Sequence, residues 1–297
     1  MDAVELRRRI PGHCTYLSVL REAAAGSITY YVGDDTAHVA HLRECTVLTR
    51  RGFAPDLDGV TVIEVEDPQL AFHRLSGDFR RDYLDYAAME DRAGARVHRD
   101  AVVPNSCTVG PGSVIGACRM SADVRIDANV VVYSDVEIGS GTTVEPGTVL
   151  GAAGMMWVWD EGKKVHLEQL GRVQVGAGCT IGSNITIVRG NANEETVVGD
   201  GTCMAHGTMI GHGCKIGEHS HFANNVSFGG GVVTGPRCFF GCGSTVSPGK
   251  TIGAGVVLGA GSVLTKDAPE SGIYVGVPAR RVSEVKETMA GIPRWTP

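Results

Sequence analysis

The sequence predicts a mainly β protein: a parallel β-helix built from hexapeptide repeats, preceded by a small α/β domain. Bulky apolar residues recur at almost every sixth position from Val198 to Leu264. This spacing is neither the 3.6-residue period of a helix nor the 2-residue period of a simple strand. The residue that follows is nearly always small, most often glycine, which permits a tight bend between short strands. Residues 1–94 lack this period.

The six-residue period covers residues 95–282. One series is led by Val97, a second begins at Met120 after a one-residue slip, and a third begins at Val175. Three such phrases make one triangular coil. About eight coils, spaced ~4.8 Å apart, give a prism about 40 Å long.

Four cysteines share one position in this repeat, the fourth residue after the leading apolar residue. Threonine, serine or valine occupies the same position in most other phrases. A small thiol fits such a position, so we expect these side chains to pack inside the prism rather than to react. They are Cys107, Cys179, Cys214 and Cys238.

Residues 1–94 predict an α/β domain, a candidate for binding the acceptor. The segments ITYYVG and TVIEVED have the composition of strands. The segment DPQLAFHRLSGDFRRDYLDYAAMEDRAG predicts a helix that begins at Asp67 and Pro68. Beyond the β-helix, residues 283–297 form a short tail, in which SEVKETMAG is compatible with one or two helical turns.

Two segments, residues 152–174 and 188–197, interrupt the repeat. The first contains MMWVW, a concentrated apolar stretch that includes Met155, Met156 and Trp157. Segments that break the period of a solenoid leave it on one face, often the working face. These side chains either form a wall for an acyl chain or pack against the prism or a neighbouring subunit.

Composition excludes several classes of protein. The net charge of −6 does not favour a nucleic-acid partner. No apolar run is long enough to span a membrane, and MDAVELRRRIPGH has no signal-peptide core. Nine cysteines, without a CxxC pair, argue against a disulfide framework or a zinc finger and for the cytoplasm.

The chain resembles the UDP-3-O-acylglucosamine N-acyltransferases of lipid A synthesis over nearly its whole length. The resemblance rests on GSITYYVG, PQLAFHRL, GTVLGAAG, QLGRVQVGAGCTIGSNITIVRG and TVVGDGTCM. The stretches MIGHGCKIG and TKDAPESGIYVGVPAR are also similar to acetyl-CoA-dependent acetyltransferases that act on amino sugars and sialic acids. The resemblance implies a left-handed parallel β-helix and a homotrimer with active sites between neighbouring prisms.

His212 is the predicted general base. Both groups of relatives place a catalytic histidine at this position, and histidine side chains exchange protons near neutral pH. Gly230 follows His212 by three phrases, which is one full coil, so it should lie beside His212 on the same side of the prism. Its exposed N–H suits the stabilisation of an oxyanion, and the lipid A relatives have their oxyanion glycine at the matching position.

The other histidines give weaker signals. His206 is one side of the prism away from His212, where it either orients the acceptor or is solvated. His219 and His221 form EHSH, but a metal site needs three or four converging ligands, so we expect no metal.

The C-terminal end predicts a donor site. The resemblance implies that GxPA and a following basic residue lie beside pantetheine and nucleotide; the alternative is that these residues only close the last coil. The candidates are Lys266, Gly276, Pro278, Arg280 and Arg281. The co-substrate implied is acyl-CoA or the phosphopantetheine of acyl carrier protein, with no permanently bound cofactor.

The acceptor site departs from the lipid A relatives. Tyr30 keeps the aromatic residue expected against a nucleotide base, but Gly33 and Thr36 replace the neighbouring asparagine and tyrosine. Gly249 stands where those enzymes have a second histidine, and the long C-terminal helices that bind carrier protein are missing. The sequence thus predicts an acyltransferase acting on an amine of a sugar or nucleotide sugar. An acetyl-CoA-dependent O- or N-acetyltransferase and a non-catalytic binding protein are the alternatives.

Overall fold

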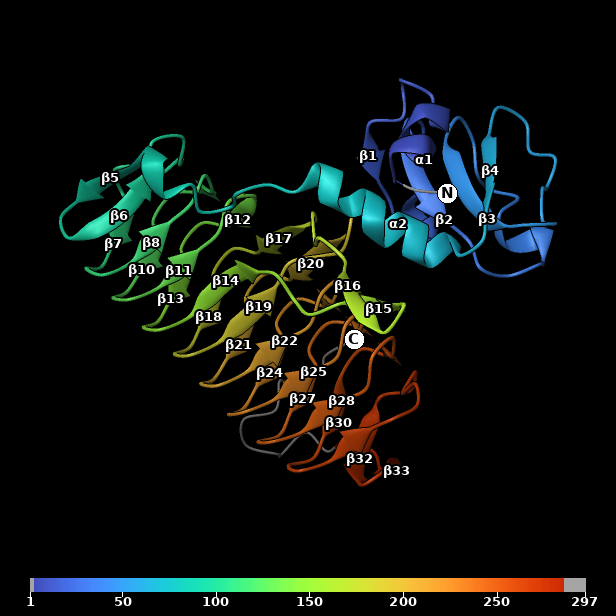
Figure 1. The fold of residues 1–297 in the computed structure, drawn as a ribbon. Helices are drawn as coiled ribbons and strands as arrows, with labels where there is room; N and C mark the ends of the chain where they lie inside the picture. Colours follow the sequence, from blue (N-terminus) through green and yellow to red (C-terminus); the bar gives the residue numbers. More distant parts are fainter. Residues whose placement is uncertain (1–2, 286–297) are drawn as a thin grey trace. The chain divides into compact units, whose positions relative to one another are not determined.

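The computed structural model describes residues 3–285, which divide into two compact units (Figure 1). The first unit comprises the chain up to Arg81 together with Ala153–Gly171 and Asn191–Glu194. The second comprises Asp82–Ala152, Arg172–Gly190 and the chain from Glu195 onward. This division differs from the predicted boundary at residue 94, because residues 82–94 belong with the β-helix and both interruptions belong with the N-terminal unit.

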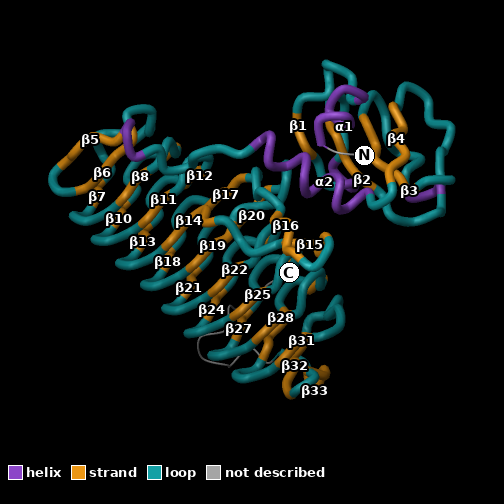
Figure 2. The backbone as a smooth tube through the Cα atoms, viewed as in Figure 1, coloured by secondary structure: helices purple, strands orange, loops and turns teal. Residues whose placement is uncertain are grey.

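The second unit is a left-handed parallel β-helix, as expected. Its strands stack coil upon coil into three sheets, which we name face 1, face 2 and face 3 in the order the chain visits them (Figure 2). The corner between two faces is named by their numbers, so corner 1–2 follows each strand of face 1. Strand partners along a face are three phrases apart in the regular coils, for example Met209 and Ser227.

The strands of the three faces are short and regularly spaced. Face 1 contains β5 (Met89–Arg92), β6 (Ala95–His98), β8 (Val114–Ile115), β11 (Val131–Val132), β14 (Val149–Ala152), β19 (Thr186–Val188), β22 (Met209–Ile210), β25 (Ser227–Phe228), β28 (Thr245–Val246) and β31 (Val263–Leu264). Face 2 contains β9 (Arg119–Met120), β12 (Val136–Ile138), β17 (Arg172–Val175), β20 (Glu195–Val198), β23 (Lys215–Ile216), β26 (Val233–Thr234) and β29 (Thr251–Ile252). Face 3 contains β7 (Thr108–Val109), β10 (Arg125–Ile126), β13 (Thr143–Val144), β18 (Thr180–Ile181), β21 (Cys203–Met204), β24 (His221–Phe222), β27 (Phe239–Phe240), β30 (Val256–Leu258), β32 (Gly272–Gly276) and β33 (Ala279–Ser283).

The leading apolar residue of each phrase fills the interior of the prism. Nearly all of these residues are buried in one continuous core cluster. Phe222, Phe228 and Phe240 form an aromatic group within it, with ring centroids 4.7 to 5.2 Å apart. The six-residue period therefore reports the packing of the interior, and it leaves the corner residues free to vary.

The cysteines in the fourth position mostly pack inside the prism, as predicted. Cys179, Cys214 and Cys238 are at most 1 % exposed, whereas Cys107 is half-buried. Burial raises the pKa of the Cys238 thiol to about 11. No disulfide joins the cysteines of residues 3–285.

The first unit contains a four-stranded parallel sheet in the order β1 (Tyr16–Leu17), β2 (Ser27–Tyr30), β3 (Thr46–Arg50) and β4 (Thr61–Val65). Helix α1 covers Ala3–Arg9 and helix α2 covers Pro68–Ser76, with short 3-10 turns at Leu20–Glu22, Thr36–His38 and Gly77–Phe79. A further 3-10 turn, Tyr86–Ala88, belongs to the second unit. This unit is α/β, as expected.

The predicted long helix over residues 67–94 is wrong beyond Ser76. Its start is as expected, because the Asp67 carboxylate accepts a hydrogen bond of 2.9 Å from the N–H of Leu70. The helix ends at Gly77, and residues 89–98 form an antiparallel hairpin that begins face 1. Phe72 and Leu75 pack in the core of the first unit, whereas Ala95 and Val97 of the hairpin pack in the core of the β-helix.

Hydrogen bonds explain why both interruptions belong to the first unit. The Glu168 N–H donates to Ser76 at 3.0 Å, and the Arg21 guanidinium donates to the buried Glu194 carboxylate at 2.6 Å. The two interruptions also meet each other, because Gln169 donates to Asn191 at 2.7 Å. Within the first interruption, β15 (Trp157–Asp160) and β16 (Lys163–His166) form an antiparallel hairpin.

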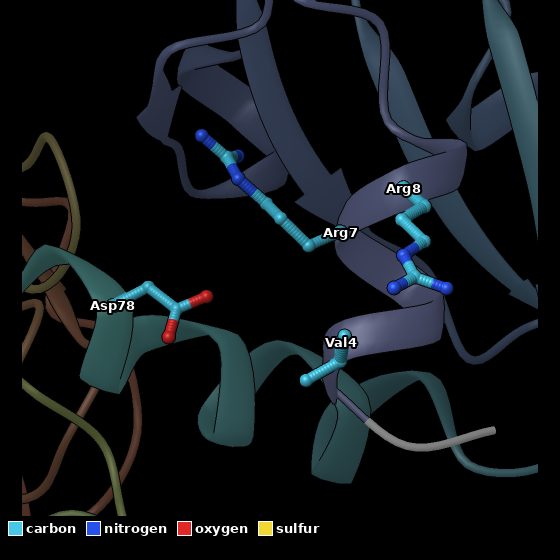
Figure 3. Close-up of a pocket in the computed structure, with 4 residues that line it drawn as sticks. All are labelled: Val4, Arg7, Arg8 and Asp78. Carbon is cyan, nitrogen blue, oxygen red and sulfur yellow. The ribbon is translucent and has the colours of Figure 1, made fainter.

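A hollow of about 300 Å³ lies on the first unit between α1 and the 3-10 turn after α2 (Figure 3). It is lined by Val4, Arg7, Arg8 and Asp78. The Arg7 guanidinium lies 5.4 Å from the ring centroid of Phe79, so this side chain helps to pack the turn against α1. Residues 286–297, which include most of the predicted helical turns of SEVKETMAG, lie outside the described residues.

Candidate active site

His212 lies at corner 1–2, directly after β22, and is half-buried. Hydrogen bonds to the preceding coil hold the turn that carries His212. The N–H of Gly213 donates to the hydroxyl of the buried Thr196 at 2.9 Å, and that hydroxyl donates to the Val188 carbonyl at 2.7 Å. The backbone beside His212 is therefore tied to the preceding coil, while the imidazole ring faces outward.

Gly230 lies one coil further, directly against the His212 ring, as the repeat predicted. A Cβ atom at Gly230 would stand 2.6 Å from Cδ2 and Cε1 of His212, which is closer than atoms can pack. The N–H of Gly231 donates to the His212 carbonyl at 2.7 Å and aligns the two coils. The φ angle at position 230 does not require glycine. Glycine is needed there because any side chain would collide with the His212 imidazole.

The backbone N–H of Gly230 takes no part in the ladder of hydrogen bonds between coils within residues 3–285. The N–H groups on either side of it, those of Gly229 and Gly231, donate to Val246 and His212, but the N–H of Gly230 has no partner within residues 3–285. Gly230 is the third residue of the phrase that begins at Phe228. In all the remaining phrases from Val198 to Leu264, the third residue is not glycine. The chain therefore presents one glycine directly against the His212 imidazole, and the N–H of that glycine makes no hydrogen bond within residues 3–285.

The same corner continues toward the C-terminal end of the β-helix. Below Gly230 come Pro248 and then the exposed Lys266, each one coil further. Three coils separate His212 from Lys266, which is about 14 Å along the axis at ~4.8 Å per coil. The predicted base and one predicted donor residue therefore share a single corner.

The remaining donor candidates lie on the last hairpin, β32–β33, which pairs with β30 on face 3. Gly276, Pro278 and Arg280 are exposed. The exposed Arg281 guanidinium donates to the Glu284 carboxylate at 2.6 Å and to the Ser271 carbonyl at 2.9 Å. These residues form one group at the C-terminal end of the prism, apart from His212.

His206 lies at a different corner, between faces 3 and 1. Its Nδ1 accepts a hydrogen bond of 3.0 Å from the Ser183 N–H and is 3.5 Å from the Glu145 carboxylate. The Ser183 hydroxyl donates to the same carboxylate at 3.0 Å. The structure therefore does not bring His206 together with His212.

The acceptor and acyl-chain candidates other than His206 belong to the first unit. Tyr30 is half-buried against Phe72, with ring centroids 4.9 Å apart, and burial raises the pKa of its hydroxyl. Met156 packs against the core of this unit, whereas Met155 and Trp157 are 81 % and 38 % exposed. Lys164, across the hairpin, places its ammonium 4.3 Å from the Trp157 ring centroid.

Arg189, which the sequence alone did not single out, lies at corner 1–2 one coil before His212. It is 1 % exposed; its guanidinium donates to the carbonyls of Gly151 at 2.7 Å and Ser134 at 2.8 Å and stacks 3.4 Å from the ring centroid of Tyr83. Burial lowers the pKa of Arg189, and the nearby Asp135 carboxylate opposes that shift. The only sign of it in the sequence is an arginine that directly follows the strand-like segment ITIV.

Two general properties of the described residues bear on the site. No three histidine, cysteine or acidic side chains within residues 3–285 converge as metal ligands would. None of the helices in that range combines the length and the apolar character required to cross a membrane.

The three-faced coil and its six-residue phrases define a hexapeptide-repeat β-helix. Residues 117–152 match the family model "Bacterial transferase hexapeptide (six repeats)". Among curated proteins, no sequence matches the chain.

Several solved structures have the same fold. UDP-N-acetylglucosamine O-acyltransferase (LpxA) from Moraxella catarrhalis RH4 is 20% identical, with 64% of this chain and 73% of that chain covered and a TM-score of 0.58. LpxA from Acinetobacter baumannii is 24% identical, with 64% and 72% covered and a TM-score of 0.57. LpxA, a UDP-N-acetylglucosamine acyltransferase, from Bacteroides fragilis 9343 is 22% identical, with 65% and 74% covered and a TM-score of 0.58. The expected resemblance to hexapeptide-repeat acyltransferases is confirmed, and the chain has their fold.

Proposed function

We propose that this protein is an acyltransferase that moves an acyl group from a pantetheine thioester to an amine of a sugar or nucleotide sugar. The observation that carries the proposal is the pairing, at one corner, of the His212 imidazole with Gly230, whose N–H makes no hydrogen bond within residues 3–285. A general base and an oxyanion donor are the two groups that acyl transfer from an activated thioester requires.

The proposed reaction uses both groups in one addition–elimination sequence. The amine nitrogen attacks the thioester carbonyl carbon while His212 removes a proton from that nitrogen. The electron pair of the carbonyl moves to oxygen, and the Gly230 N–H donates to the resulting oxyanion. Collapse of the intermediate restores the carbonyl and expels the thiolate, which takes the proton from the imidazolium.

The donor is proposed to lie along corner 1–2, with its phosphate toward the C-terminal end. Lys266 shares the corner with His212, and Arg280 is exposed on the last hairpin. Basic side chains recognise phosphate, which both acyl-CoA and the phosphopantetheine of acyl carrier protein contain. The cytoplasm, expected from the cysteines, and a homotrimer, expected from the resemblance, belong to the same proposal.

A panel of donors and acceptors tests the proposal. Purified protein is mixed with acetyl- to myristoyl-thioesters of CoA and of carrier protein, and with a pool of amino sugars and UDP-amino sugars. Mass spectrometry follows the free carrier and the acylated acceptor, since thiol dyes would react with the protein's own cysteines. We expect carrier release only when an acceptor is present. No transfer with any pair, together with simple ligand binding, would favour the non-catalytic alternative.

The proposal also specifies the acceptor atom, which is an amine nitrogen rather than a hydroxyl oxygen. The solved LpxA structures belong, by their names, to O-acyltransferases or to acyltransferases of UDP-N-acetylglucosamine. Acceptors that carry one free amine or only hydroxyl groups separate the two chemistries in the same panel. A product that survives mild alkaline hydrolysis is an amide, as we propose, and one that is cleaved is an ester.

A further inference from the structure

Lys250 breaks the pattern of the repeat at the corner that carries His212. The fourth residue after each leading apolar residue is directed into the prism. In the other coils of this corner it is Cys214, Val232 and Ala268, each 0 % exposed. Lys250 takes the same position and is only half-buried.

A lysine in this position must direct its ammonium out of the apolar interior. Its side chain makes no ion pair or hydrogen bond with any residue in the described range 3–285. Long basic side chains bury their methylene stem and keep the charged end in water, because an unpaired buried charge is costly. The half-buried state of Lys250 fits this arrangement.

The opening available to the ammonium lies beside Gly230. Gly249, the residue before Lys250, donates its N–H to the Gly230 carbonyl at 2.9 Å. A Cβ atom at Gly249 would meet nothing within 4 Å, and one at Gly231 would meet only the Gly249 backbone, at 3.9 Å. Apart from the Pro248 ring, which packs against Gly229, this corner therefore carries no side chain at Gly230, Gly231 and Gly249, the residues nearest to Lys250.

We propose that Lys250 is a further catalytic residue, whose ammonium stabilises the oxyanion together with the Gly230 N–H. This inference rests on the proposed acyl transfer. The oxyanion forms when the amine attacks the thioester carbonyl, and it disappears when the thiolate leaves, so the ammonium acts only as a positive charge and takes part in no bond change. Lys266, one coil further from Gly230, remains the candidate for the donor phosphate.

Stability gives an independent readout, because the position itself favours a small apolar side chain. Replacing Lys250 by valine restores the residue found at Val232, so Lys250→Val should unfold at the same or a higher temperature than the wild type. A residue retained against stability at an active site is the pattern of a stability–activity trade-off.

The test measures kcat, donor KM and Tm for the wild type, Lys250→Val, Lys250→Met and Lys250→Arg, with the donor–acceptor pair found in the panel. We expect about a 10²-fold loss of kcat in the valine and methionine variants, unchanged donor KM and partial recovery with arginine. Lys215→Met, on face 2 one residue after Cys214, is the matched control and should keep full activity.

Each alternative outcome has a distinct meaning. Wild-type kcat in Lys250→Met, with His212→Ala inactive, would overturn the role of Lys250 and leave the proposed function intact. A raised donor KM with unchanged kcat would also overturn it, because that result assigns Lys250 to the donor phosphate. A wild-type protein that transfers no acyl group would overturn both.

Discussion

Replacing Gly230 by alanine tests whether the imidazole of His212 works from its observed position. The added methyl group would lie 2.6 Å from two ring carbons of His212, where non-bonded carbons prefer about 3.5–4.0 Å. The ring must therefore move by about 1 Å. Because His212 is half-buried at a corner, it can swing toward solvent without disturbing the core.

The expected effect is a loss of activity without a loss of folding. A displacement of about 1 Å at a catalytic group costs about 10²-fold in rate. The free energy of unfolding should change by no more than about 0.5 kcal/mol, as for surface substitutions. Steady-state kinetics and thermal unfolding measure the two quantities on the same preparation.

Gly77→Ala is the matched control, because no atom lies within 4 Å of the added Cβ and φ is −58°. It should keep full activity. Wild-type kcat in Gly230→Ala would refute the reasoning, since the imidazole would then function in a position that the methyl group excludes. A large loss of stability would also contradict it, by showing that the ring cannot move.

Four further predictions concern other parts of the molecule. If the exposed Trp157 lines an acyl channel, Trp157→Ala should alter chain-length preference in the thioester panel, and an unchanged preference would exclude that role. Arg189→Met leaves two buried carbonyl groups without their donor and should cost about 2–4 kcal/mol in denaturant unfolding; a neutral result would contradict the bonding described. A thiol reagent should label the exposed Cys242 in the folded protein, but Cys118 and Cys238 only after unfolding, as peptide mapping would reveal. Burial raises the pKa of Cys118 to about 12 and that of Cys238 to about 11, above the ordinary 9.0. The folded state therefore keeps these protons to a higher pH than the unfolded state does. The free energy of unfolding should be at its full value below pH 9 and should fall as the pH rises toward 11.

The β-helix could be predicted from the sequence because its core is local and periodic. Leading residues such as Ile210 and Phe228 fill the same position in successive coils, so one spacing predicts both burial and strand register. The same spacing placed Gly230 beside His212. No long-range information is needed in the regular coils, because neighbours in space are always three phrases apart in the chain.

The interruptions could not be assigned in this way, because their structure depends on partners far away in the sequence. The Glu194 carboxylate accepts a hydrogen bond from Arg21, and the Glu168 N–H donates to the Ser76 hydroxyl. The helix after Asp67 was predicted too long for a related reason: residues 89–98 pair with each other as strands, which a helical composition does not reveal.

Exceptions to a repeat carry information that its regular positions do not. Lys250 stands where apolar or small residues are the rule, and Arg189 is a fully buried charge; both lie at corner 1–2. The structure explains Arg189 by its bonds to backbone carbonyls. Lys250 has no such explanation within the described chain, which is why it is the stronger candidate for a chemical role.

The most direct test of the central claim compares wild type and His212→Ala for acceptor-dependent release of free CoA or holo-carrier protein. His221→Ala, a histidine variant on face 3, is the control for the substitution itself. We expect His212→Ala to lose about 10²- to 10⁴-fold in kcat at unchanged Tm, while the control remains active. Equal release by wild type and His212→Ala would exclude His212 as the general base, because the base would then lie elsewhere.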